Sequence, residues 1–285
     1  RLIVERSDNH NLPPILNNAL EGFKTMTSVE GIHGSLLILG ELMNYAMEFM
    51  QGHMSITWDH LKSYKEHKDK LVRSTLTRLI PKAAACNVHI FIKSYVNTFM
   101  DLLINQLDSE SSGLDLRGLS FIAIGELAIA LKKEEKLPAI LQEVAEPNSK
   151  AKTLNEYLQF NSIFKEVEES LVSKSKTVNE ALQCVSMLAR GLGAAIHLGT
   201  GMKDFLDKIF GVGLRTHLIT ALEALVDSIP SLLKDLQLRL MDTLSKILLA
   251  PKTYQTKPLN ESIEIEKKKD KKKKVVSVTS EHNPE

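Results

Sequence analysis

Apolar residues recur with helical spacing along most of the chain before position 250. In each of five segments they are three, four or seven residues apart, which places them on one face of a helix at ~3.6 residues per turn. The pattern therefore predicts a series of amphipathic helices. The first stripe, assigned to a single helix, is Ile32, Leu36, Leu39, Met43, Met47 and Met50; the others are Ile92, Val96, Phe99, Leu103 and Leu107; Val178, Leu182, Val185 and Leu192; Leu218, Leu222, Leu225 and Ile229; and Leu233, Leu236, Leu240, Leu244 and Ile247.

Alternation typical of strands is almost absent and appears only at residues 275–279. The longest nearly apolar run, Leu119–Leu131, contains Ser120 and Glu126. It is shorter than the ~20 residues that a membrane-spanning helix needs. The sequence therefore predicts an all-α body with one strongly buried helix and no transmembrane segment.

Short breaks containing Gly, Asn or Pro separate the predicted helices. Pro81 and Pro230 each follow an apolar segment. Proline is tolerated in the first turn of a helix and disrupts a helix interior. We therefore expect each of these prolines to lie where one helix gives way to the next, with helix pairs as the natural unit.

One segment of the chain matches another at an offset of 85 residues. Leu36–Leu42 reads Leu-Leu-Ile-Leu-Gly-Glu-Leu, and Phe121–Leu127 reads Phe-Ile-Ala-Ile-Gly-Glu-Leu. Half of that offset is close to the ~40–47 residue period of HEAT and armadillo repeats. The match favours a HEAT/armadillo-type helical-repeat solenoid, in which each helix pair buries its apolar face on its neighbours. A compact, non-repetitive helical bundle is the alternative.

The composition indicates an ordinary globular body followed by a tail of different composition. There are 36 Lys and Arg against 35 Asp and Glu, a net charge of +1, with 43% hydrophobic residues. This balance excludes a strongly electrostatic body. Residues 251–285, by contrast, hold nine Lys and few apolar anchors. We expect residues 1–250 to form the helical repeats and residues 251–285 to form a disordered tail.

A lysine tract in the tail is the clearest surface feature of the sequence. Seven ammonium groups in eight residues would attract import receptors, anionic lipid or nucleic acid. A solubilising tail without a specific partner is the alternative. No aromatic residue follows Tyr254, which argues against stacking on nucleic-acid bases. The tract, a candidate targeting signal, is Lys267, Lys268, Lys269, Lys271, Lys272, Lys273 and Lys274.

Catalytic and metal-binding patterns are weak. His53, His60 and His67 are seven residues apart. Two helical turns separate such residues by ~10.5 Å, too far for a shared zinc ion. Gly191 and Gly193 begin like a dinucleotide fingerprint but follow a helix, so we interpret them as a helix stop and turn. We expect no metal site, no cofactor and no small-molecule substrate in this chain.

The two cysteines give little chemistry. Cys86 and Cys184 are far apart in sequence, which favours a reducing, intracellular compartment over a disulfide framework. Cys86 precedes His89 and could act as a thiolate with a base. The apolar residues around it instead predict a buried, unreactive thiol at a corner between two helices.

Two stretches resemble the N-terminal HEAT-repeat region of the target of rapamycin (TOR) kinases. They are Gly31–Leu42 and Cys184–Arg190, and further similar segments follow in the same order between residues 20 and 250. The resemblance is loose around residues 145–175, and the Lys-rich tail is not typical of the family. Since position 1 is Arg and not Met, we also expect the chain to be a fragment.

The resemblance implies a piece of a very large serine/threonine kinase whose catalytic domain lies far downstream. None of the kinase's catalytic residues would then be present, and ATP and Mg would belong to the parent only. In the family this solenoid is a platform for Raptor-like or Rictor-like subunits of TOR complexes, which couple growth to nutrients. We expect protein partners, no nucleic acid, and a cytoplasmic location, with the nucleus and endomembrane surfaces as further sites.

Two hypotheses besides the non-catalytic scaffold segment stay open. The alternative is a free-standing helical-repeat adaptor, of the transport or phosphatase-scaffold type, with the lysine tract as its targeting signal. A third hypothesis, an unrecognised helical enzyme using Cys86 and His89, ranks lowest.

Overall fold

The computed structural model describes most of the chain up to Leu249. The chain divides into two units, Arg1–Leu233 and Lys234–Glu285, and each is considered by itself. The described residues are 10–25, 28–108, 114–145, 152–172, 175–196 and 201–249.

Every regular element among the described residues is helical, which confirms the all-α prediction. Three short turns, η1, η2 and η4, join or extend the helices. The elements of the first unit are α2 (Leu12–Thr25), α3 (Val29–Tyr45), α4 (Met47–Gln51), α5 (Met54–Ser63), α6 (Lys70–Cys86), α7 (Val88–Ile90), η1 (Phe91–Tyr95), α8 (Val96–Leu107), α10 (Leu114–Lys132), α11 (Leu137–Glu143), α12 (Leu154–Tyr157), α13 (Phe160–Val172), α14 (Val178–Leu192), η2 (Gly193–Ile196), α15 (Met202–Gly211), α16 (Thr216–Ser228) and η4 (Pro230–Leu232).

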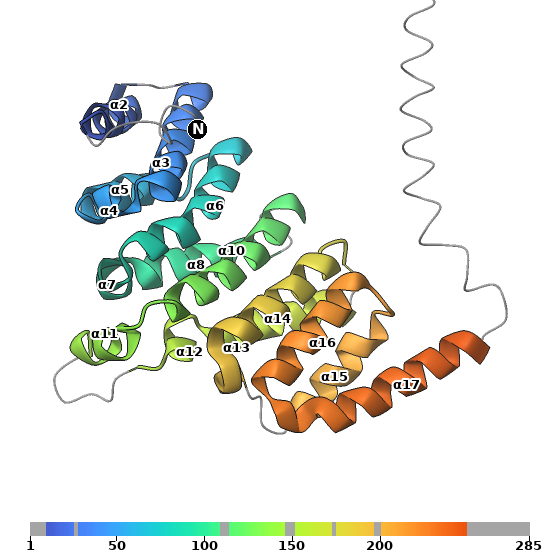
Figure 1. The fold of residues 1–285 in the computed structure, drawn as a ribbon. Coiled ribbons are helices and arrows are strands. Elements are labelled where there is room, and N and C mark those ends of the chain that lie inside the picture. The colour runs from blue at the N-terminus through green and yellow to red at the C-terminus, as the bar shows by residue number, and fades with distance from the viewer. Residues whose placement is uncertain are drawn as a thin grey trace, which may run out of the picture. The chain divides into compact units, whose positions relative to one another are not determined.

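The first unit is built from two layers of helices. Helices α3, α6, α10, α14 and α16 pack side by side in chain order and form one layer (Figure 1). Helices α2, α5, α8, α13 and α15 each contact a helix of that layer or a neighbour in their own layer. Because successive helix pairs stack on one another, the structure is the helical-repeat solenoid that the sequence predicted.

The repeat period is visible in the first layer. Helix α6 begins 41 residues after α3, and α10 begins 44 residues after α6. The next step, to α14, is longer because α11 and α12 are inserted before it. The two segments of the self-match, Leu36–Leu42 and Phe121–Leu127, lie in α3 and α10 of the same layer, with α6 between them. The self-match therefore marks equivalent positions two repeats apart.

The glycines of the self-match explain why this pattern recurs. A Cβ at Gly40 would lie 2.8 Å from the Leu79 side chain of the next helix in the layer. The equivalent Gly125 faces Met187 of α14, where a Cβ would lie 2.6 Å from the Met187 methyl. At either position an added Cβ would force the side chain of the neighbouring helix to shift, because that helix approaches so closely. The repeated glycine is therefore a packing feature of the layer.

The core confirms the buried faces that the sequence predicted for α8, α14 and α16. All residues of those three stripes are buried. The second layer is anchored by the single tryptophan, Trp58 of α5, which is inaccessible to solvent. Its ring lies 4.6 Å from that of Phe99 and 5.2 Å from that of Phe91, centroid to centroid. These contacts join α5 to η1 and α8.

The first predicted helix is in fact two helices. Helix α3 ends at Tyr45, and α4 begins at Met47, because Ala46 has a non-helical backbone with φ −134° and ψ 45°. The break turns Met47 outward, where it is 43% exposed, whereas Met43 and Met50 stay buried. The predicted buried positions on α3 are confirmed. The prediction that this segment forms one continuous helix is wrong.

Pro81 does not mark a helix boundary, contrary to the expectation. It lies inside α6, which continues to Cys86. Tertiary packing overrides the local preference here, since Leu79, Ile80 and Ala83 around it are all buried against neighbouring helices. Pro230 behaves as predicted and begins η4 directly after α16.

The second unit contains one described helix, α17 (Leu233–Leu249), which begins at the last residue of the first unit. Of the stripe predicted for it, only Leu236 is buried, whereas Leu233 and Ile247 are exposed. The tail at 251–285, with its lysine tract at 267–274, lies outside the described residues, so its predicted disorder stays a prediction.

Candidate functional site

No metal-binding group of His, Cys, Asp and Glu occurs among the residues that the structure describes. His60 instead stacks on Phe23, and His53 lies against Phe49. His67 accepts a hydrogen bond from the Asp69 amide. Within the same residues, no helix is long and apolar enough to cross a bilayer.

Cys86 and His89 lie at the same corner between helices, and the two side chains have different surroundings. Cys86 is buried, and its Sγ lies 4.0 Å from the carbonyl oxygen of Met43. Burial raises the pKa of the Cys86 thiol to about 11. The Nε2 atom of His89 lies 3.0 Å from a carboxylate oxygen of Glu143 on α11. A neutral, buried thiol and a histidine paired elsewhere lack the geometry of an activated nucleophile.

Gly193 ends α14 as the sequence predicted. It has φ 59°, and its amide bonds back to the carbonyl of Ala189. This left-handed conformation favours glycine and closes a helix, whereas a dinucleotide site would need a glycine turn that opens one.

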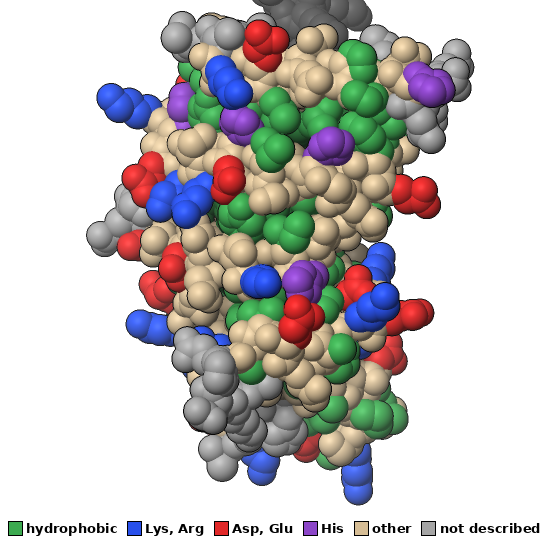
Figure 2. Space-filling model, turned by 90° about the vertical axis from the view of Figure 1, so that its left-hand side faces the viewer, with side chains coloured by type: hydrophobic (Ala, Val, Ile, Leu, Met, Phe, Trp, Pro, Cys, Tyr) green, Lys and Arg blue, Asp and Glu red, His purple; other side chains and the backbone are tan. Residues whose placement is uncertain are grey.

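One face of the first unit carries exposed apolar side chains. Figure 2 shows hydrophobic side chains, together with histidines, on the face that lies at the left of Figure 1. Most charged side chains lie toward its margins, and a few lie near its centre. Helices α4 and α5 lie on that side, and they carry Met47, 43% exposed, and Ile56, 55% exposed. Exposed apolar area of this kind is typical of protein contact surfaces.

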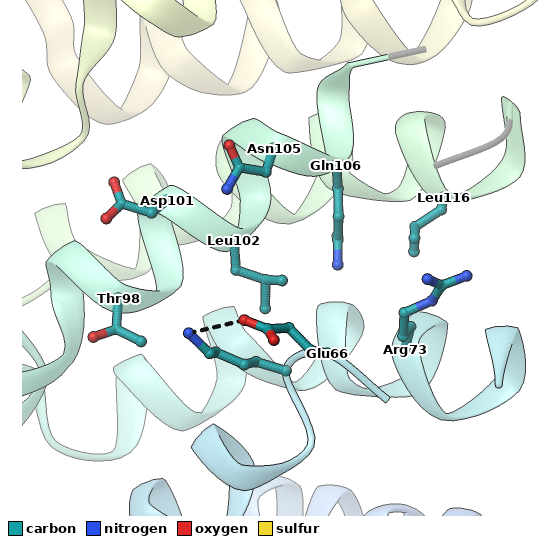
Figure 3. A pocket seen from close by; sticks show the side chains of 9 residues that line it. Glu66, Arg73, Thr98, Asp101, Leu102, Asn105, Gln106 and Leu116 are labelled. Atoms are coloured by element: carbon teal, nitrogen blue, oxygen red, sulfur yellow. Dashed lines mark ion pairs between the residues drawn. The ribbon is translucent and has the colours of Figure 1, made fainter. Parts of the chain in front are cut away.

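A polar pocket of about 390 Å³ lies between α8 and the connection from α5 to α6 (Figure 3). Lys65, Glu66 and Arg73 line one side, and Asp101 and Gln106 of α8 line the other. Its lining contains no cysteine, histidine or serine. Most of its lining residues are polar or charged, so it can offer hydrogen bonds and charge to a ligand.

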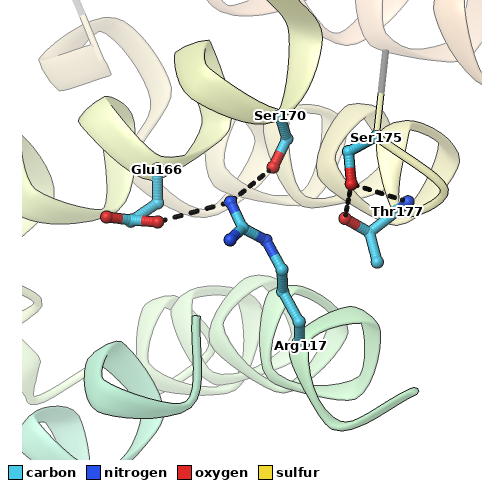
Figure 4. A network of polar contacts seen from close by, with 5 residues as sticks. All are labelled: Arg117, Glu166, Ser170, Ser175 and Thr177. Atoms are coloured by element: carbon cyan, nitrogen blue, oxygen red, sulfur yellow. Dashed lines mark hydrogen bonds and ion pairs between the residues drawn. The ribbon is translucent and has the colours of Figure 1, made fainter. Parts of the chain in front are cut away.

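A buried ion pair joins the two layers near the middle of the first unit. Arg117 of α10 is 3% exposed, and one guanidinium nitrogen lies 3.3 Å from the Glu166 carboxylate and 2.9 Å from the Ser170 hydroxyl, both on α13 (Figure 4). Burial raises the pKa of Glu166, and the charge of Arg117 opposes that rise. The closed geometry leaves no room for a substrate, so this network is structural.

Sequence reasoning missed both the pocket and this ion pair. Arg117 precedes the apolar run of α10 and has no pattern that distinguishes it from an exposed arginine. The pocket residues come from α8 and from the start of α6, and only the stacking of repeats brings them together. Helical periodicity predicts which face is buried, and it carries no information on which polar side chains meet.

Comparison with known proteins finds similar proteins of one kind. No family model matches the chain. The chain is 30% identical over 240 residues to a protein of Arabidopsis thaliana named serine/threonine-protein kinase TOR, and 33% identical over 230 residues to the protein of that name in Oryza sativa subsp. japonica. It is 29% identical over 238 residues to serine/threonine-protein kinase tor1 of Schizosaccharomyces pombe.

These matches cover 80% to 84% of this chain and only 8% to 9% of the relatives. The chain therefore spans less than a tenth of the length of the proteins it matches. The matches extend over most of the helical repeats and confirm the resemblance first seen in Gly31–Leu42 and Cys184–Arg190. By sequence, this chain is homologous to one segment of the TOR family of serine/threonine kinases.

Proposed function

We propose that this chain is a non-catalytic scaffold segment of a TOR-type kinase that holds partner subunits of TOR complexes. The observation that carries the proposal is the combination of a two-layer helical-repeat body with homology to a small part of TOR kinases. Stacked helix pairs provide a long surface on which large proteins can bind. The partners we propose are Raptor-like or Rictor-like subunits.

We assign no phosphotransfer to this chain. Its two thiols are buried, and the described residues hold no group of side chains that could bind a metal ion. ATP and Mg would be bound by the kinase domain of the parent, in the part of the relatives that these matches do not reach. The scaffold would act where the parent acts, in the cytoplasm, in the nucleus or on endomembrane surfaces.

Co-purification tests the scaffold role. The tagged 285-residue chain is co-expressed with a Raptor-like or a Rictor-like subunit from the same source, and the retained subunit is measured after washing at moderate salt. The matched control is the same chain without residues 267–274, which removes the lysine tract and leaves every described helix intact. We expect both forms to retain a subunit and neither to transfer phosphate from ATP. Loss of the subunit from both forms, or phosphotransfer by either, would contradict the proposal.

The same control separates the scaffold from a free-standing adaptor. An adaptor steered by its tail loses its cellular location when residues 267–274 are deleted and does not depend on TOR subunits. The lysine tract, with seven positive charges in eight residues, is the feature that favours this second function.

A further inference from the structure

The pocket between α8 and the α5–α6 connection contains hydrogen-bond donors that have no partner among the residues the structure describes. Figure 3 shows side chains from three segments, α6, α8 and the residues after α5, directed toward one space of about 390 Å³. A volume of this size accommodates a side chain with a short piece of backbone. Which groups around it are already paired decides what it can bind.

Most charged groups at this pocket and its margin have partners. Lys65 lies 3.2 Å from Glu66, and Lys70 lies 2.6 Å from Asp115. Asp101 accepts a hydrogen bond of 2.7 Å from the side-chain amide of Gln159. The two lysines are thus paired, whereas Asp101, like Glu66, brings an acidic side chain to the lining of the pocket.

Gln106 supplies the first unsatisfied donor. The residue is buried, with 5% of its surface exposed. Its side-chain oxygen accepts hydrogen bonds of 2.9 Å from Thr77 and 2.7 Å from Ser120. These bonds fix the amide on α8. Its nitrogen has no hydrogen bond to a residue that the structure describes, and it is directed into the pocket (Figure 3).

Arg73 supplies the second. It lies near the start of α6, and its Nε atom is inaccessible to solvent and has no hydrogen-bond partner. Its guanidinium pairs with no carboxylate in the part of the chain that the structure describes. Because Nε is closed to solvent and Arg73 lines the pocket, the terminal nitrogens of its guanidinium are the donors open to a bound acceptor.

We propose that this pocket binds an acidic side chain of a partner protein, with the Arg73 guanidinium and the Gln106 amide donating hydrogen bonds to its carboxylate. A carboxylate has two oxygens that match the planar fork of arginine, and it leaves acceptor capacity for a third donor. A neutral side chain would leave the charge of Arg73 uncompensated. The acidic anchor rests on the proposed scaffold function, because it gives the chemistry of one contact between this segment and a partner.

Glu66 opposes such a ligand. Its side chain lines the same pocket and is 83% exposed, held by Lys65 at the surface. A negative charge there lowers the affinity for a carboxylate. Removal of that charge is therefore expected to strengthen binding, which gives the proposal a gain-of-binding test.

Arginine side-chain NMR measures the contact directly. The probe is a blocked peptide, acetyl-Ala-Ala-Glu-Ala-Ala-amide, titrated into the full chain labelled with ¹⁵N-arginine, and the control probe carries Gln in place of Glu. We expect the Glu peptide to shift the Nε–Hε signal of Arg73 in a saturable manner and the Gln peptide to leave it in place. Arg78, exposed on the same helix, is the internal control and stays unshifted.

Three variants make the result specific. Arg73→Gln is expected to weaken binding by about tenfold, since it removes a charge-assisted hydrogen bond. It removes no side-chain hydrogen bond of the folded chain, and Trp58 fluorescence during unfolding checks that the fold is kept. Gln106→Glu keeps the oxygen that Thr77 and Ser120 need and places a carboxylate beside Arg73, which should abolish binding. Glu66→Gln should strengthen it.

Two results would overturn the proposal. Equal shifts of Arg73 and Arg78 with the Glu peptide, or none, would show that the pocket has no carboxylate site. Saturation by inorganic phosphate at lower concentration than by the peptide would assign the pocket to phosphate instead. Neither result depends on co-purification of TOR subunits, so the pocket and the scaffold role can fail separately.

Discussion

The guanidinium of Arg117 lies 3.3 Å from the carboxylate of Glu166, and this pair joins α10 of one layer to α13 of the other. Arg117 is the more buried partner, with 4% of its side chain exposed against 21% for Glu166. A second bond, from Arg117 to the Ser170 hydroxyl, ties the same guanidinium to α13. A buried polar contact thus joins the two layers of the first unit.

Loss of Arg117 should destabilise the first unit. The variant Arg117→Met leaves the partly buried Glu166 carboxylate without its cation, and we expect the free energy of unfolding to fall by about 3 kcal/mol. Urea denaturation followed by circular dichroism measures this. The exposed pair Lys70 and Asp115 is the matched control, and Lys70→Met should cost less than about 1 kcal/mol.

The double variant Arg117→Met, Glu166→Leu tests the cause of this destabilisation. It distinguishes the loss of packing around Arg117 from the cost of a buried Glu166 carboxylate without its cation. Replacing both ions with apolar side chains should restore most of the stability, because no uncompensated charge is left behind. A double variant as unstable as Arg117→Met alone would show that packing around Arg117, and not its charge, sets the cost.

Gly191 should tolerate alanine less well than Gly40. A Cβ at Gly191 would lie 2.8 Å from the backbone carbon of Ala128 on α10, and backbone cannot move aside as a side chain can. At Gly40 the obstacle is the end of the Leu79 side chain, which is flexible. We expect a loss of about 2 kcal/mol for Gly191→Ala and less for Gly40→Ala.

Thermal unfolding of the two variants beside Gly52→Ala tests this order. Gly52 has helical backbone angles and nothing within 4 Å of an added Cβ, so its variant should match the parent chain. A larger effect at Gly40 than at Gly191 would mean that the α10–α14 contact is looser than the structure shows.

The Cys86 thiol should be almost unreactive in the folded chain. Its pKa is raised by burial from 9.0 to about 11, so at pH 8 the thiolate fraction is about a hundredfold lower than in the unfolded chain. Alkylation by iodoacetamide, located by mass spectrometry, should be slow in buffer and fast in urea. Comparable rates in both would show that Cys86 is open to solvent.

The same pKa difference makes stability depend on pH. The unfolded thiol loses its proton near pH 9, whereas the folded thiol keeps it until about pH 11. The contribution of Cys86 is therefore complete below pH 9 and is lost as the pH rises toward 11. The free energy of unfolding should decrease more between pH 8 and pH 10.5 for the parent chain than for Cys86→Ala. The difference between the two decreases is the contribution of the Cys86 thiol.

The sequence predicts the layers of this fold better than its polar contacts. Periodic apolar positions such as Leu103 and Leu222 are buried as expected, because burial follows the helical period. The break at Ala46 and the passage of α6 through Pro81 could not be predicted, since tertiary packing decides both against local preference. Arg73 and Gln106 are 33 positions apart, and they share a pocket only because consecutive repeats stack.

Deletion of residues 10–249 from the full-length parent kinase tests the scaffold role most directly. The amount of Raptor-like and Rictor-like subunit that co-purifies with the parent is measured, and phosphorylation of a generic peptide serves as the control for an intact kinase domain. We predict that subunit binding falls sharply while peptide phosphorylation is retained. Full retention of both subunits by an active deleted kinase would contradict the scaffold role of this segment.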